Sequence, residues 1–427
     1  MAVAEQKNAQ LAVTAPVSGG WSLKAREDAL TRLNAVGLPG RRDEYWKYTR
    51  PDALTQATAP EGKFVSYEET PVFSEVDRLK IVFVDGVFDA DQSDDLSLEG
   101  VTIERLAAVA DKDIHWAQGL YGVLEANGQT PVSRPLATAN TVAATDGILL
   151  NVTGKVSKPI SMIYLYESNN SDAMLHHVVK LAEDTEITIL ENGPAAARFN
   201  TVMEVDVGDR ASFHHIRTQG RQHVRHAATH MFARLGEESQ FRSFTMTVNG
   251  TLTRNEAVIE INGDNTLAHI AGVVAGDGAT DQGFHHDDTI FITHDAVNGE
   301  SRQVFKKVLR NGATGVFQGK ILVKADAQKT DGYQISQGLL LDDDSNFLAK
   351  PELEIYADDV ICSHGSTCGA IDDTALFYLR SRGVPLAEAQ DLLVLAFLAE
   401  AIDEVADEAI RDLLTVRLES WLARRRA

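Results

Sequence analysis

Hydrophobic positions in the first 145 residues follow helical spacing more often than strand spacing. Apolar residues recur every three to four positions across 22–36, which predicts a short amphipathic helix that ends at a Gly-x-Pro sequence. Similar helical patterns begin at Ile103 and at Ile114, whereas the run IVFVDGVF from Ile81 predicts a strand. Residues 1–145 are therefore expected to form a mixed α/β region that is mostly helical.

Between residues 146 and 372 the pattern changes to short β-rich runs separated by Gly, Asn, Asp, Ser and Pro. In VFQGKILVKA, apolar side chains fall on one side of the predicted strand and polar ones on the other; the apolar side holds Phe317, Ile321, Val323 and Ala325, and the polar side Gln318, Lys320 and Lys324. Glycines recur at intervals of roughly 12 to 16 residues, which is typical of either a β-sandwich or a β-solenoid. Spacing alone does not decide between these two folds. A solenoid would have unpaired strand edges at its ends, and we expect flanking helices to cover them.

Helical spacing returns over residues 373–427, where the pattern predicts three closely connected helices. The middle helix is apolar nearly all round between residues 392 and 398. Such a helix is either buried on every side, or half buried and half committed to a partner. The interpretation as an internal core helix is the favoured one.

Composition and charge exclude several classes of protein. The 427 residues contain 40 Lys and Arg against 62 Asp and Glu, and a net charge of -22 repels the phosphate backbone of nucleic acids. No run of about 18 apolar residues is present, so an integral membrane protein is not expected. The amino-terminal residues show no targeting pattern and only two cysteines occur, which fits a reducing compartment and predicts a cytoplasmic location.

Several chemical motifs are present only in part. GVFQGKI from Gly315 lacks the first glycine and the Ser or Thr of a phosphate loop, so the chain is not expected to bind nucleotide by itself. His223, His226 and His230 would align three imidazoles on a helix, but in a strand His223 points away from the other two. In two adjacent pairs, only one ring of each pair can face inward; these pairs are His214 with His215 and His285 with His286. Core or surface polar roles are therefore favoured over zinc binding.

The segment EYWKYT near Glu44 concentrates Tyr45, Trp46 and Tyr48 in four positions. Such an aromatic cluster usually anchors a segment against a core. We favour this interpretation over ligand binding.

The segment DDVICSHGSTCG, residues 358–369, differs from the other motifs. Cys362 and His364 are two apart at the end of an alternating strand, so both side chains project from one face and could reach the same metal. Cys368 follows a predicted Gly-Ser-Thr turn and could swing back or stay buried. Three donors are fewer than the four that usually hold an iron-sulfur cluster or structural zinc, which indicates a site completed by another chain. The alternative is a buried cysteine beside a hydrogen-bonded histidine.

Five segments in the same order resemble the SufB/SufD family of iron-sulfur cluster assembly scaffolds, and the SufD branch more closely than the SufB branch. They are EYWKYT, LATANTVAATDGILL, RQVFKKVLRNGATGVFQGKILV, KTDGYQISQGLLL from Lys329, and PELEIYADDVICSHGSTCGAIDDTALFYLRSRG up to Gly383. The resemblance covers nearly the whole chain. It implies a right-handed parallel β-helix core over 146–372, flanked by the N-terminal region and the C-terminal helical domain.

The resemblance also implies a function. Proteins of this branch are non-catalytic scaffolds that pair with SufB through the β-helix and dock the ATPase SufC through the C-terminal helices, here expected around Leu392, Leu395 and Phe397. By position, Cys362 and His364 would take part in cluster assembly at the SufB interface. A transient iron-sulfur cluster would be shared with SufB, and the isolated chain would hold no tightly bound cofactor. In the absence of SufB, the chain could form a homodimer. No role is implied for Cys368, because that position is often apolar in similar sequences.

Two other functions remain open. A stand-alone metal-binding β-solenoid would use the 13 histidines, but their spacing lacks a four-ligand pattern. A β-helix enzyme acting on carbohydrate would need clustered carboxylates; the acidic runs 287–288 and 342–344 are better interpreted as turns.

Overall fold

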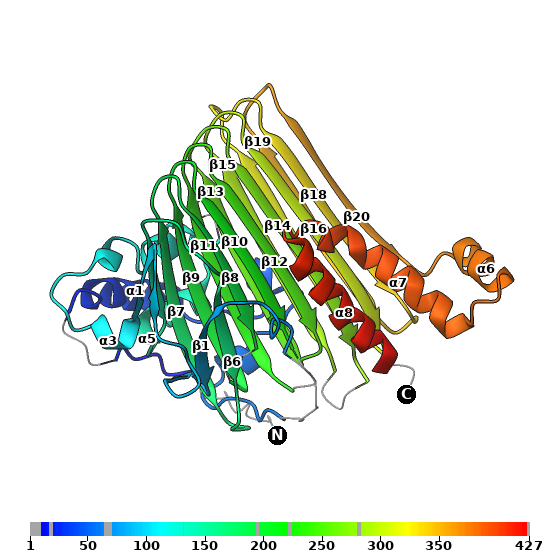
Figure 1. The fold of residues 1–427 in the computed structure, drawn as a ribbon, viewed down its shortest axis with the longest axis horizontal. Helices are drawn as coiled ribbons and strands as arrows, with labels where there is room; N and C mark the ends of the chain where they lie inside the picture. Colours follow the sequence, from blue (N-terminus) through cyan, green and yellow to red (C-terminus); the bar gives the residue numbers. More distant parts are fainter. Residues whose placement is uncertain are drawn as a thin grey trace, which may run out of the picture.

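The computed structural model describes residues 10–16, 20–63, 71–130, 132–193, 196–220, 224–279 and 283–424. Its centre is a parallel β-solenoid made of two ten-stranded sheets (Figure 1). From residue 148 onward, successive strands alternate between the two sheets, and each pairs in parallel with the strand two places along the chain. The solenoid is therefore the correct alternative, and a sandwich is excluded.

The strands of each sheet stack residues that lie one coil apart in the sequence. One sheet contains β5 Ile148–Val152, β7 Asp172–Leu181, β9 Arg198–Val207, β11 His226–Leu235, β13 Leu252–Ile261, β15 His285–His294, β17 Thr314–Val323 and β19 Asn346–Ile355. The other contains β6 Ile160–Leu165, β8 Glu186–Asn192, β10 Ser212–Gln219, β12 Gln240–Val248, β14 Leu267–Asp277, β16 Glu300–Arg310, β18 Asp331–Leu340 and β20 Ile361–Gly369. Phe213 thus pairs with Phe241, and their ring centroids lie 5.3 Å apart.

The alternation of side chains fills the space between the two sheets with an apolar core. Ile189, Phe213, Phe241 and Phe305 belong to this core and are almost fully buried. The glycines that punctuate the sequence lie in the turns between strands, and Gly220 adopts a positive φ of 91° there.

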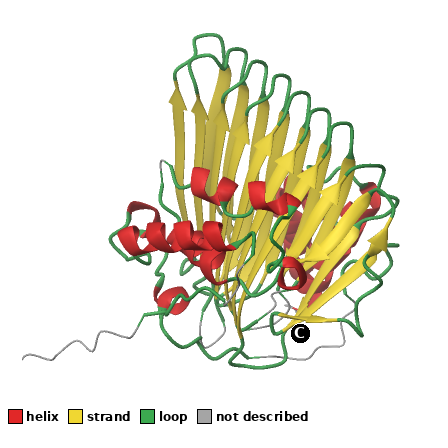
Figure 2. Cartoon of the chain, turned by 90° about the vertical axis from the view of Figure 1, so that its left-hand side faces the viewer, coloured by secondary structure: helices red, strands yellow, loops and turns green. Residues whose placement is uncertain are grey.

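N-terminal elements cover the outer face of the sheet that ends in β19, as Figure 2 shows from the side. They are α1 Leu23–Val36, η1 Glu44–Trp46, α2 Asp52–Thr55, α3 Leu106–Val109, η2 Trp116–Gly119, α4 Val123–Asn127 and α5 Pro135–Ala143. The aromatic segment anchors as predicted, because Trp46 is buried under the guanidinium of Arg254 at 4.1 Å and Tyr45 packs on Phe291 at 5.2 Å.

Two of the predicted N-terminal helices are wrong in extent. Ile103 lies in a strand, β4 Val101–Arg105, which pairs antiparallel with β5. The pattern from Ile114 breaks into η2 and α4, because Gly122 takes a left-handed φ of 72° between them. Tertiary pairing and this turn override the local helical spacing.

The predicted C-terminal helices are α6 Asp373–Ser381, α7 Leu386–Ile402 and α8 Glu408–Arg424. α7 packs on the outer face of β14 and β16, where Val394 and Leu398 are buried. Leu395 and Phe397 pack partly against the same core, whereas Leu392 is 46% exposed, so α7 is half buried. None of the helices in the described parts of the chain is long and apolar enough to cross a membrane.

The ends of the solenoid differ from the expectation that helices would cover both. At the N-terminal end, the edges belong to antiparallel strands: β2 Val87–Asp89 pairs with β1 Leu79–Val84, and β3 Ser97–Leu98 pairs with β4. At the other end, β19 and β20 are the last strands of their sheets, and most of their residues are partly or fully exposed. The helices lie on the sheet faces instead, because the apolar outward-facing side chains are there.

Candidate functional site

The last coil of the solenoid carries Cys362 and His364 on strand β20. Cys362 pairs in register with Gly332 and packs beside Ile321, which places its side chain on the inner side of the sheet. His364, two residues further along the strand, lies on the same side at a Cα separation of about 7 Å, and it is exposed. No further coil of the described chain covers these two residues. A thiol and an imidazole, both of which can bind metals, therefore lie at the open end of the solenoid.

The thiol of Cys362 lies directly over Gly332. A Cβ atom on Gly332 would be 3.1 Å from Sγ, so the glycine makes room for the sulfur. Burial raises the pKa of Cys362, and the nearby charge of Asp331 acts in the same direction. Cys362 therefore rests as a thiol at neutral pH and must lose its proton when it binds a metal.

Cys368 does not join this pair. The predicted turn at residues 365–367 is wrong, because β20 continues through it in parallel pairing with β18. Along an extended strand Cys368 is about 20 Å from Cys362, and its side chain is exposed rather than buried. The straight ladder prevents it from swinging back.

Within the described residues, no three His, Cys, Asp or Glu side chains are grouped so that they could hold a metal ion. Cys362 and His364 are two donors on one face of a strand, whereas tetrahedral zinc and cluster iron take four. The arrangement can supply part of a coordination sphere to a metal that also binds elsewhere.

Most of the other described histidines serve as core polar groups. His226 and His230 are buried in β11, and His230 Nδ1 lies 3.2 Å from the carbonyl of Thr201; His223 lies outside the described residues. The prediction that one ring of each adjacent pair faces inward is confirmed. His215 is buried with Nε2 2.6 Å from Glu191, and His286 is buried beside Lys307.

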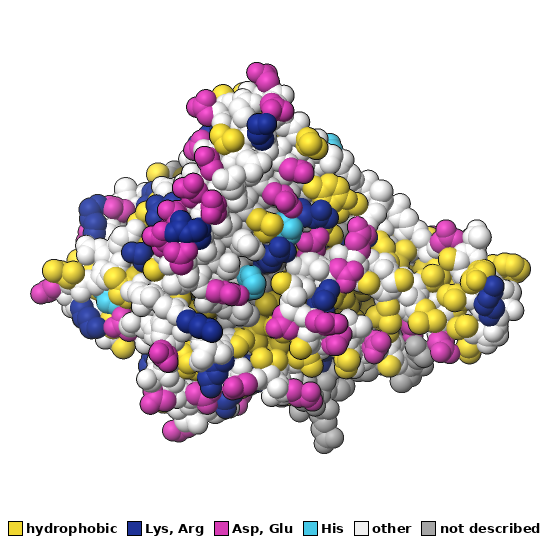
Figure 3. All heavy atoms as spheres, turned by 45° about the horizontal axis from the view of Figure 1, so that its top comes forward, with side chains coloured by type: hydrophobic (Ala, Val, Ile, Leu, Met, Phe, Trp, Pro, Cys, Tyr) yellow, Lys and Arg dark blue, Asp and Glu magenta, His cyan; other side chains and the backbone are white. Residues whose placement is uncertain are grey.

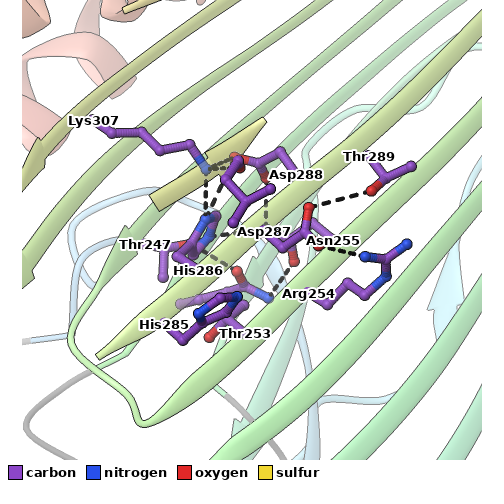
Figure 4. Close-up of polar contacts among 12 residues, drawn as sticks. Thr247, Thr253, Arg254, Asn255, His285, His286, Asp287, Asp288, Thr289 and Lys307 are labelled. Atoms are coloured by element: carbon purple, nitrogen blue, oxygen red, sulfur yellow. Dashed lines mark hydrogen bonds and ion pairs between the residues drawn. The ribbon is translucent and has the colours of Figure 1, made fainter. Parts of the chain in front are cut away.

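Charged groups are buried on both sides of β15 (Figure 4). Inside the solenoid, Asp288 accepts a hydrogen bond of 2.7 Å from Lys307 Nζ. On the outer face, Arg254 donates to Asp287 and, at 2.5 Å, to Glu256. The interpretation of residues 287–288 as a turn is therefore wrong: they lie in a strand and are neutralised by buried cations, so they do not form an exposed carboxylate pair.

The acidic run 342–344 does form a turn. Its first carboxylate, on Asp342, accepts backbone N–H bonds from Ser345 at 2.9 Å and from Asp344 at 3.2 Å. These contacts leave the run as a structural turn between β18 and β19.

Sequence reasoning missed the pair formed by His176 and Glu204. Both side chains are fully buried, with Nε2 2.8 Å from Oε2, and Glu204 also accepts the backbone N–H of Gly122 at 2.6 Å. Burial raises the pKa of Glu204 to about 8 and lowers that of His176 to about 3. Both residues lie in strands whose sequences mix apolar and polar residues without a clear pattern. Only the register between neighbouring coils could therefore have indicated this contact.

An exposed apolar surface lies on the projecting C-terminal helices (Figures 1 and 3). We call it the α6–α7 patch; it consists of Phe377, Tyr378, Leu386 and Leu392, which are 74%, 55%, 43% and 46% exposed. α6 has no buried residue at all. Large apolar side chains gathered in this way are typical of a protein interaction surface.

Two family profiles match most of the chain. The profile described as "SUF system FeS cluster assembly, SufBD core domain" matches residues 164–397, and "SufBD protein N-terminal region" matches residues 21–162. The core match includes the last coil, α6 and most of α7.

Three curated relatives are similar to the chain over 61% or more of their own length. The chain is 29% identical over 404 residues to "Iron-sulfur cluster assembly protein SufD" of Escherichia coli (strain K12), covering 91% of this chain and 90% of the relative. It is 27% identical over 404 residues to an iron-sulfur cluster assembly SufBD family protein of Synechocystis, covering 89% and 86%. With SufD of Bacillus subtilis it shares 30% identity over 272 residues, which covers 62% of this chain and 61% of the relative.

Proposed function

The chain belongs to the SufBD family of the SUF iron-sulfur cluster assembly system, and we propose that it acts there, in the cytoplasm, as a non-catalytic scaffold that pairs with SufB and docks the ATPase SufC. Its part in cluster assembly would be to help acquire iron and hold the nascent cluster together with SufB. The observation that carries this proposal is the open last coil, where Cys362 and His364 face the uncovered end of the solenoid.

The strand edges at this end support pairing with SufB. β19 and β20 present backbone N–H and C=O groups that a partner strand can pair with, so the two sheets could continue into a second chain. A partner bound there would bring its own ligands next to Cys362 and His364. The cluster would then lie between two chains, each of which supplies part of the coordination sphere.

The proposed mechanism couples SufC to this interface. ATP-driven closure of SufC would pull on the C-terminal helices, which are attached to the solenoid through α7 on β14 and β16. A shift of these strands would open the end of the solenoid to iron and sulfide. An imidazole is a weaker cluster ligand than a thiolate, so His364 suits a site that must release its product.

Replacing His364 by Ala is expected to lower cluster formation about tenfold or more, because one ligand of the shared site is lost. The measurement is the rate and yield of iron and sulfide incorporation on the complex reconstituted with SufB and SufC. Ser363→Ala is the matched control, since Ser363 lies on the same strand with its side chain on the opposite face. Unchanged rate and yield in His364→Ala would remove this residue from the mechanism.

Introducing a charge at Leu392 is expected to weaken SufC binding about tenfold or more, because the α6–α7 patch would then bury an unpaired carboxylate. Binding of SufC to Leu392→Glu is measured by calorimetry, and folding by circular dichroism. Val416→Glu on α8 is the control, because Val416 is 58% exposed but lies outside the patch. Equal SufC affinity in Leu392→Glu and Val416→Glu would contradict docking at this patch.

A further inference from the structure

Two buried glutamines lie in the column beneath His364. Gln303 on β16 pairs in register with Gln334 on β18, and Gln334 pairs with His364 on β20. Neighbouring strands are about 4.8 Å apart, so His364 and Gln334 are cross-strand neighbours whose side chains project from the same face of the sheet. These three residues form a polar column that ends at the open coil.

The amide of Gln334 is held on one side and unsatisfied on the other. Its Nε2 donates to Gln303 Oε1 at 2.9 Å, and the side chain is fully buried. Gly319 makes room for it, because a Cβ atom there would lie 2.3 Å from Nε2. Within the described chain, Oε1 of Gln334 is buried and accepts no hydrogen bond. A buried acceptor without a donor is costly, so a donor from the last coil would be stabilising.

We propose that Gln334 is a positioning residue for His364: its amide oxygen accepts the N–H of one ring nitrogen and turns the other nitrogen toward the shared cluster. Metal-binding histidines usually donate their second N–H to such an acceptor, which fixes the tautomer and the orientation of the ring. The inference rests on the proposed function, in which His364 is a cluster ligand.

The neutral amide also sets the strength of the ligand. A carboxylate acceptor makes a bound imidazole more basic and its metal bond stronger, whereas an amide oxygen does so less. Gln334 would therefore orient the imidazole of His364 without strengthening its bond to the cluster so much that the cluster cannot be released. Replacing Gln334 by Glu keeps an acceptor next to His364 and gives it a charge, provided that the Gln303 amide rotates so that its Nε2, which has no partner in the described chain, donates to the new carboxylate.

The first experiment measures the tautomer of His364 in the isolated full-length chain by NMR with ring ¹⁵N-labelled histidine, assigned by comparison with His364→Ala. The native protein is expected to show one dominant tautomer, and Gln334→Met a mixture or the opposite tautomer, because the acceptor is gone. Ser336→Ala is the matched control, since its hydroxyl lies 2.7 Å from Ser366 rather than beside His364. An unchanged tautomer in Gln334→Met, with folding intact by circular dichroism, overturns the inference.

The second experiment measures cluster formation on the complex with SufB and SufC. Gln334→Met is expected to lower the yield about tenfold, and Gln334→Glu to restore it while slowing transfer of the cluster to an apo-ferredoxin. If His364→Ala abolishes assembly but Gln334→Met changes neither tautomer nor yield, the inference is wrong and the proposed function stands. If Gln334→Met changes the tautomer while neither variant affects assembly, the proposed function is wrong and the positioning of His364 stands.

Discussion

Acidification from pH 7.5 to pH 5 is expected to lower the free energy of unfolding by roughly 4 to 8 kcal/mol, because several histidines are buried in their neutral form. Burial lowers the pKa values of His177, His226, His230 and His294 to about 4. In the unfolded chain these imidazoles take up protons below a pH of about 6.5. Their contribution to stability is therefore complete above that pH and is lost as the pH falls toward 4.

One buried pair acts partly in the opposite direction. The pKa of Glu204 is raised to about 8, so the folded state favours its protonated form, and this contribution grows as the pH falls below 8. It offsets the loss from its partner His176, whose pKa is lowered to about 3. The loss from the four histidines named above is not offset by this pair, and burial lowers the pKa of His286 in the same direction, so the protein is expected to be sensitive to acid.

The measurement is urea unfolding followed by circular dichroism at pH 7.5, 6 and 5. His294→Asn is the informative variant, because burial is the cause of the low pKa of His294 and no charged group is needed to explain it; its Nε2 lies 2.8 Å from the hydroxyl of Ser301. We expect the slope of its free energy of unfolding against pH to be smaller by up to about 1.4 kcal/mol per pH unit, which corresponds to one proton fewer taken up on unfolding. A stability that stays constant between pH 7.5 and pH 5 would contradict the explanation.

The sequence predicted the class of each region better than the arrangement of its strands. The alternation of apolar and polar residues predicts the face of the sheet on which a side chain lies, and Phe317 and Ile321 are both buried as expected. It does not report which strand lies next to it. In a parallel solenoid the neighbour is one coil away, as for Phe213 and Phe241, and no local pattern records that distance.

The same limit explains the errors at charged positions. Polar residues in an alternating strand or acidic run are normally assigned to solvent or to turns, as residues 287–288 were. Here Asp288 faces the interior and meets Lys307, which lies on the next strand in sequence but in the other sheet. The candidate pair Cys362 and His364 was identifiable because both residues lie on one strand, two positions apart, whereas Gln334 is linked to His364 only through the register of the last two coils.

Replacing Lys307 by Met is expected to destabilise the protein by about 3 to 5 kcal/mol, because it leaves a charge buried without its partner. The side chain of Lys307 is fully buried between the sheets. Its Nζ donates to Asp288 Oδ2 and to the carbonyl oxygen of Val316, both at 2.7 Å, and lies 3.0 Å from His286 Nδ1 (Figure 4). Methionine fills a similar volume, so the loss should come mainly from the electrostatic contacts rather than from a cavity.

A second substitution separates these two causes. Lys307→Met combined with Asp288→Asn removes the unpaired carboxylate while keeping its shape, so the double variant should recover more than half of the lost stability. Lys324→Met is the control, because its ion pair with Asp295 is solvent-exposed and should contribute less than about 1 kcal/mol. Urea unfolding of the three variants at pH 7.5 provides the comparison. If the single and double variants were equally unstable, packing rather than charge would be the function of Lys307, and the interior of the solenoid would tolerate a lone carboxylate.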